Sequence, residues 1–190
     1  MPSYLTCLVA VAVLIASGNA AAQRSAVSIY TDISGRACEK HVDDKLTGAY
    51  TLDCRGVHGF RLHVLEDDER SSISIVTPDK QIFPLNYWDV VTQGFSTLGA
   101  KVEWRITRAD GEAVPVAVIV RVNALDQSDP EHPKRVPLLA VAKITRNAAC
   151  VTGVIDALAA DANKEARRFS DDQRLACLPI KSVAKPATKG

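Results

Sequence analysis

The stretch TLGAKVEWRITRADGEAVPVAVIVRV, residues 97–122, decides the expected fold of this chain. Two apolar runs, Val102–Ile106 and Val114–Val122, flank a turn that contains Asp110 and Gly111. An Asp-Gly pair between β-branched residues is a strong hairpin signal, because glycine accepts the positive φ that such turns need. The stretch therefore predicts an antiparallel hairpin within a β-sheet.

The two arms of this hairpin have different patterns. In the first arm, alternation places Trp104 on one face with its apolar neighbours, and we expect it in the core. Glu103 and Arg105 fall on the opposite face, and we expect them to face solvent. The second arm holds five consecutive apolar residues, Val116–Val120, so both of its faces should be covered, one of them by a helix. Pro115 cannot donate to a strand ladder, so it must start this strand or lie at an open edge.

Further strands are expected on both sides of the hairpin. Apolar runs bounded by turn residues predict strands at 46–54, 57–65, 72–76, 138–145 and 150–157. Helical spacing after Asp161 predicts a C-terminal helix with Asp161 at its N-cap, and we expect a short helix around Asn86–Gln93. Because the strands follow one another without intervening helices, the expected fold class is α+β. It is an antiparallel meander of about six to seven strands with the C-terminal helix packed on it.

Three charged or polar segments are expected to be loops. Glu39–Asp44 and Glu66–Arg70 consist almost entirely of charged residues and histidine, which is typical of solvated connections. Asn123–Val136 is polar and contains two prolines. A connection of that length inside one domain is often mobile or functional.

The two ends of the chain differ from the rest. Residues 1–22 contain no charged side chain, and Cys7–Ala16 is a continuous apolar run that precedes an A-x-A site. This pattern predicts a secretory signal peptide over residues 1–22, and the run is too short for a permanent membrane-spanning helix. Residues 23–180 should form a single domain, and the tail 181–190 should be disordered because it lacks large apolar side chains.

Removal of the signal peptide leaves four cysteines. An even number in an oxidising compartment predicts two disulfides, for which three pairings are possible. Locality favours Cys38–Cys54 and Cys150–Cys177, because each pair frames a self-contained segment at one end of the domain. A zinc site is not expected, because no C-x-x-C pair occurs.

The composition and the motifs narrow the function classes. The formal net charge is +1, which gives no reason to expect nucleic acid as a partner. The chain contains no G-x-S-x-G, no H-E-x-x-H and no glycine-rich phosphate loop. Its 22 acidic residues offer many carboxylate pairs, none of which is singled out by spacing. We therefore expect no catalytic residue, no metal site and no cofactor.

Two segments of the C-terminal half resemble a known family. TLGAKVEWR at residues 97–105 and CVTGVIDALAADANKEAR at 150–167 resemble a family of small uncharacterised exported proteobacterial proteins, and the resemblance covers roughly residues 29–178. It implies a signal peptide, four cysteines and a periplasmic or secreted destination, and it brings no catalytic residue. A second resemblance, at Tyr50, Cys54 and Gly56, is to small β-type periplasmic lysozyme inhibitors. Those proteins have the tyrosine two positions before the cysteine, and here the separation is four.

Together these observations predict a non-enzymatic binding or interaction protein of the cell envelope, with another envelope protein or a glycan as partner. Tyr87 and Trp88 are adjacent, so one of them should be exposed, and they are the expected ligand contacts. The alternatives are a periplasmic hydrolase whose acids are assembled only in the fold, and a lysozyme-inhibitor-like protein.

Overall fold

A computed structural model describes residues 26–180, which form ten strands and two helices. The elements are β1 (Val27–Asp32), β2 (Cys38–Val42), β3 (Tyr50–Arg55), β4 (Arg61–Asp67), β5 (Arg70–Val76), β6 (Ile82–Pro84), α1 (Tyr87–Val90), β7 (Ser96–Ala109), β8 (Glu112–Asp126), β9 (Lys134–Ile144), β10 (Ala149–Asp156) and α2 (Ala162–Asp171). The predicted signal peptide over residues 1–22 and the predicted disordered tail over 181–190 lie outside the described residues.

The predicted hairpin is present as β7 and β8. Asp110 and Gly111 alone separate the two strands, with φ values of 51° and 86°. Two consecutive residues with positive φ form the turn that matches the twist of a β-hairpin. Pro115 lies within β8 and has no backbone N–H to donate. Because β9 pairs with β8 only from Ala117 onwards, this missing donor lies beyond the end of the β8–β9 ladder.

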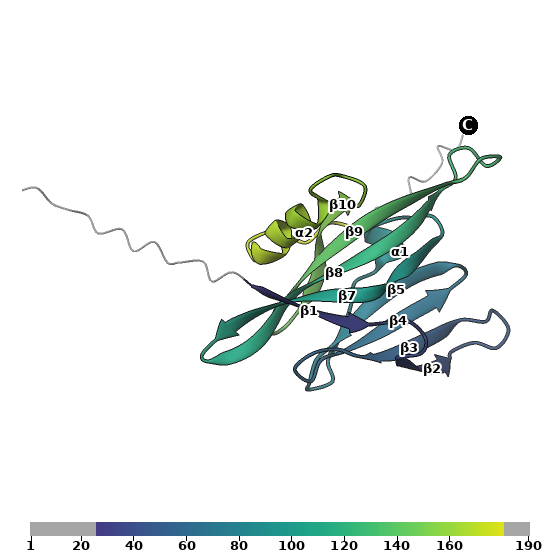
Figure 1. Cartoon of the computed structure of the whole chain (residues 1–190). Coiled ribbons are helices and arrows are strands. Elements are labelled where there is room, and N and C mark those ends of the chain that lie inside the picture. The colour runs from purple at the N-terminus through teal and green to yellow at the C-terminus, as the bar shows by residue number, and fades with distance from the viewer. Residues whose placement is uncertain (1–25, 181–190) are drawn as a thin grey trace, which may run out of the picture.

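The sheet is larger than expected and is mixed. The strand order is β10-β9-β8-β7-β5-β4-β3-β2, with β1 beside β7 and β6 beside β5. The expected meander of six to seven antiparallel strands is therefore wrong in two respects. Ten strands are present in residues 26–180, and β5 runs parallel to β7 at the pair Arg70 and Ser96. The parallel contact arises because β6 and α1 lie between the two strands in sequence and return the chain to the same end of the sheet. Figure 1 shows β2–β5 and β7–β10 as the two halves of this sheet.

The inner faces of the two halves share one hydrophobic core. Trp104 is fully buried in it, and its Nε1 donates to Thr31 Oγ1 of β1 over 2.8 Å. The edge of the Phe60 ring faces the Trp104 ring at a centroid distance of 6.2 Å. The prediction that Trp104 is a core residue is confirmed.

Helix α2 covers the outer face of β8, β9 and β10 (Figure 1). Ala162 and Ala166 are buried there against Ile119 and Val141, so both faces of β8 are covered, as expected. The helix begins after Asp161, but the Asp161 side chain makes no capping hydrogen bond. The position of the helix therefore depends on its packing against the sheet.

Gly153 of β10 allows α2 to approach the sheet closely. A Cβ atom at position 153 would lie 2.7 Å from Cδ1 of Phe169. We expect Gly153→Ala to lower the free energy of unfolding by about 1–3 kcal/mol, because the ring must move out of its packed position. Gly35→Ala is the matched control, since no heavy atom lies within 4 Å of a Cβ there. Urea denaturation of the two variants measures the difference, and equal stabilities would contradict the close packing of Phe169.

The expectation that Glu103 and Arg105 face solvent is wrong. Both residues are buried beneath α2, with 7% and 5% of their surface exposed. Nε and Nη2 of Arg105 donate to the two carboxylate oxygens of Asp171, at 3.0 and 2.8 Å. Nε of Arg167 donates to Glu103 Oε1 over 2.7 Å. These ion pairs connect α2 to β7, and their helix partners lie more than sixty residues further along the chain.

Two disulfides join the pairs that locality favoured. Cys38 is bonded to Cys54 across β2 and β3, and Cys150 is bonded to Cys177, which follows α2. The second bond ties the segment after the helix to β10. It lies close to the hydrogen bond from Leu178 N to Val151 O, at 2.8 Å.

All three expected loops are partly strand. Cys38–Val42 forms the exposed edge strand β2. Asp68 and Glu69 alone separate β4 from β5. Strand β8 extends to Asp126, and β9 begins at Lys134. Cross-strand hydrogen bonding and the disulfide of β2 override the low apolar content of these segments. The short helix expected around Asn86–Gln93 is present as α1.

Candidate functional site

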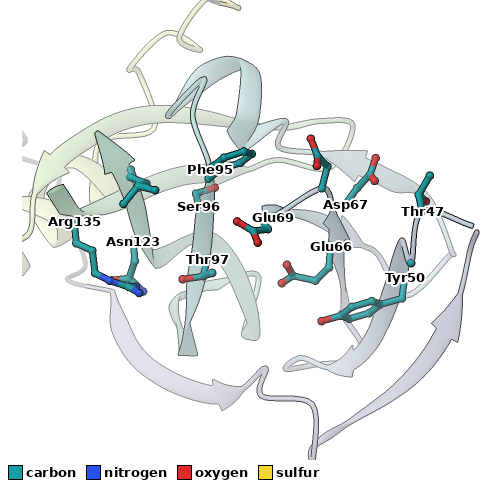
Figure 2. Close-up of a pocket in the computed structure, with 14 residues that line it drawn as sticks. Thr47, Tyr50, Glu66, Asp67, Glu69, Phe95, Ser96, Thr97, Asn123 and Arg135 are labelled. Atoms are coloured by element: carbon teal, nitrogen blue, oxygen red, sulfur yellow. The ribbon is translucent and has the colours of Figure 1, made fainter. Parts of the chain in front are cut away.

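A hollow of about 590 Å³ lies beside the place where β5, β7 and β8 meet. It is lined by the β4–β5 turn, the start of β7 and neighbouring parts of β3, β8 and β9 (Figure 2). Ligand sites for small molecules commonly have volumes of roughly 300–1,000 Å³. The hollow is therefore large enough for a small organic molecule.

Four consecutive acidic residues, Glu66–Glu69, form one wall of the hollow. Glu66 and Asp67 end β4, and Asp68 and Glu69 make the turn to β5. Both turn residues have positive φ, 47° and 55°, a conformation that costs residues other than glycine about 1–2 kcal/mol each. The turn is held against β7 by the hydrogen bond from Ser96 N to Glu69 O, at 2.8 Å.

These carboxylates are only partly neutralised by the protein. Asp68 pairs with Arg70, and Glu66 accepts a hydrogen bond from Ser71 Oγ. Across residues 26–180, the Asp67 and Glu69 carboxylates have neither a hydrogen bond nor an ion pair. The wall therefore presents unbalanced negative charge to the hollow.

Glu66 is half-buried, whereas the other three residues of this wall are exposed. Burial raises the pKa of its carboxyl group, and the hydrogen bond from Ser71 opposes part of that shift. Tyr50 lies directly opposite Glu66 in the β3–β4 ladder. Burial, together with the charge of Glu66, raises the pKa of the Tyr50 hydroxyl.

The opposite side of the hollow is polar and carries a cation. Thr97 of β7 pairs with Asn123 of β8, and Leu125 of β8 pairs with Arg135 of β9. Because side chains two apart on a strand share a face, Thr97, Asn123 and Arg135 project from one face of three adjacent strands. No protein partner is present for these three side chains within the described part of the chain. Figure 2 shows Arg135 and Asn123 across the start of β7 from Glu66 and Glu69.

Ser96 lies in the wall between the two sides. It is 3% exposed, and its Oγ atom is buried without a hydrogen-bond partner among the described residues. A buried hydroxyl without a partner costs free energy, so such groups call for an explanation. Ser96 lines the hollow, so this unpaired hydroxyl group belongs to the wall of the site.

The expected ligand contacts are not part of this hollow. Tyr87 is fully buried, so it cannot contact a ligand at the surface, and burial raises the pKa of its hydroxyl group. Trp88 is half-exposed on α1, and its role as a ligand contact stays a prediction. Among residues 26–180, no group of three or more His, Cys, Asp and Glu side chains is arranged to hold a metal ion.

Two of the segments that line the hollow were expected to be loops. Glu66–Arg70 and Asn123–Val136 are far apart in the chain, and they come together where β5 pairs with β7. In the sequence, the first segment is distinguished only by its charge and the second only by its length. Neither signal shows that the two segments meet.

Searches with family models, among curated proteins and among solved structures find no match to this chain. The resemblance to small exported proteobacterial proteins therefore stays a prediction.

Proposed function

We propose that this protein is a non-enzymatic binding protein of an oxidising, extracytoplasmic compartment. Its ligand is a small organic molecule that carries an ammonium group, which lies against the acidic wall of the hollow. The observation that carries the proposal is the unbalanced charge of that wall, where Asp67 and Glu69 have no protein partner in the described chain. The buried Ser96 Oγ without a partner supports it independently.

The compartment is inferred from the disulfides. Two crosslinked pairs are typical of proteins that fold in the periplasm or outside the cell, because cytosolic thiols are kept reduced. Within residues 26–180, neither helix has the length and apolar character that a membrane crossing requires. The expected envelope partner, a second protein or a glycan, stays a prediction.

L-lysinamide is a suitable probe, because it has two ammonium groups and no carboxylate at mildly acidic pH. We expect it to shift the backbone NMR signals of Glu69, Ser96 and Thr97. We expect Glu69→Gln to weaken binding about tenfold, because a charge-assisted hydrogen bond is lost. Glu131→Gln, an exposed residue of the β8–β9 connection outside the hollow, should leave binding unchanged. Absence of binding, or equal effects of the two variants, would refute the proposal.

One observation favours a hydrolase as the second candidate. Glu66 has a raised pKa, and a carboxyl group of that kind can act as a general acid. Release of reducing ends from peptidoglycan by the wild-type protein, together with its loss in Glu66→Gln, would decide for the hydrolase. We expect no release by either protein.

A further inference from the structure

The hollow has walls of opposite charge that do not touch each other. The acidic wall, Glu66–Glu69, belongs to β4 and the β4–β5 turn, whereas Arg135 belongs to β9. Arg135 is exposed and makes no ion pair with any described residue. From this arrangement we infer that the ligand is a zwitterion of the amino-acid class, with its ammonium group at the acidic wall and its carboxylate at Arg135. The inference rests on the proposed binding function and adds the identity of the second charged group.

Strand geometry sets the distance between the two walls. From β5 to β9 the sheet crosses β7 and β8, which is three strand spacings, or roughly 14 Å between the outer backbones. Glu69 and Arg135 side chains each reach across part of this distance, and Figure 2 shows them still apart. A molecule of amino-acid size fits between them, so one ligand can contact both charges.

The floor between the walls is suited to the polar middle of such a ligand. Thr97 and Asn123 offer a hydroxyl and an amide group that have no protein partner in the described chain. Both lie on the same sheet face as Arg135. Their donors can supplement the guanidinium in binding a carboxylate, which usually accepts several hydrogen bonds.

The arginine at position 135 is suited to binding a carboxylate. Its planar guanidinium group can donate two parallel hydrogen bonds to one carboxylate, which gives direction as well as attraction. A ligand with only positive charges would be attracted to the acidic wall but repelled by Arg135. The unpaired Arg135 therefore discriminates against simple amines in favour of zwitterions.

L-lysine and L-lysinamide are the matched probes, because they differ only in a carboxylate or a neutral amide. We expect the wild-type protein to bind L-lysine about tenfold more tightly than L-lysinamide, measured by NMR titration at mildly acidic pH. Arg135→Gln should remove this preference by weakening L-lysine and not L-lysinamide. Arg146→Gln, an exposed arginine in the β9–β10 turn outside the hollow, should keep the preference.

The results of these titrations distinguish a failure of the zwitterion inference from a failure of the proposed function. If both probes bind equally to the wild-type protein, or if Arg135→Gln weakens both to the same extent, the zwitterion inference is wrong and the cation site stands. If neither probe binds, both are wrong. Arg135 is exposed, so the variant is expected to fold, and an unchanged thermal midpoint verifies this.

Discussion

Replacement of Trp104 by alanine is expected to lower the free energy of unfolding by about 3–5 kcal/mol, the range for removal of a large aromatic side chain from a core. Trp104 is fully buried between the two halves of the sheet. Its loss would leave a cavity beside Phe60 and would leave the Thr31 hydroxyl without its donor. A loss of this size is a large fraction of the stability of an ordinary domain. Urea denaturation followed by circular dichroism measures it.

Two further variants show whether packing or hydrogen bonding dominates at this position. Trp104→Phe keeps an aromatic ring and removes the indole donor, so we expect a loss clearly smaller than that of Trp104→Ala. Trp88→Phe is the matched control on a half-exposed tryptophan and should change stability by less than about 0.5 kcal/mol. If Trp104→Ala is no more harmful than the control, Trp104 is not the centre of the core.

The parts of the fold that could be predicted depend on local patterns. The β7–β8 turn was predictable because Asp110 and Gly111 both accept positive φ, and Trp104 was predictable because strand alternation assigns its face. The disulfide pairs were predictable because each closes a short segment. In each case the residues that decide the structure are close in sequence.

The parts that could not be predicted depend on contacts between distant segments. The β4–β5 turn uses Asp68 and Glu69 in the left-handed region, where a sequence pattern would place glycine or asparagine. Its conformation is held by Ser96, which is far along the chain. The hollow has the same origin, because it forms where the parallel pair Arg70 and Ser96 joins the two halves of the sheet.

Burial of Glu103 could not be predicted for a related reason. Alternation correctly placed it on the face opposite Trp104, but α2 covers that face and brings Arg167 to it. The carboxylate also accepts hydrogen bonds from Ser28 and Tyr30 of β1. Charged residues on an outer strand face are usually solvated, and these are buried because the helix supplies partners for them.

Replacement of Glu103 by glutamine is the second large expected effect. Arg167 would lose its buried carboxylate partner, and Arg105, whose Nη1 lies 3.8 Å from Glu103 Oε1, would lose a nearby negative charge. Removing one partner of a fully buried ion pair typically costs about 3–5 kcal/mol, and the loss here is smaller because the Arg167 side chain is 41% exposed and Arg105 keeps its bond to Asp171. We expect a loss of about 2 kcal/mol at neutral pH, measured by urea denaturation. Glu112→Gln, at an exposed position that begins β8, is the control and should have little effect.

The pH dependence of this loss distinguishes a charge effect from a packing effect. Burial acts to raise the pKa of Glu103, but the hydrogen bonds from Arg167 and Ser28 outweigh it and hold the pKa below its usual value of 4.5. The unfolded chain therefore binds the proton more tightly than the folded one, so the stabilisation is present above pH 4.5 and is lost as pH falls through the lower folded-state pKa. The difference between wild type and Glu103→Gln should shrink as pH falls below 4.5, because the protonated carboxyl group then resembles the amide. A difference that is constant between about pH 7 and pH 3 would mean that shape, and not charge, holds α2 on the sheet.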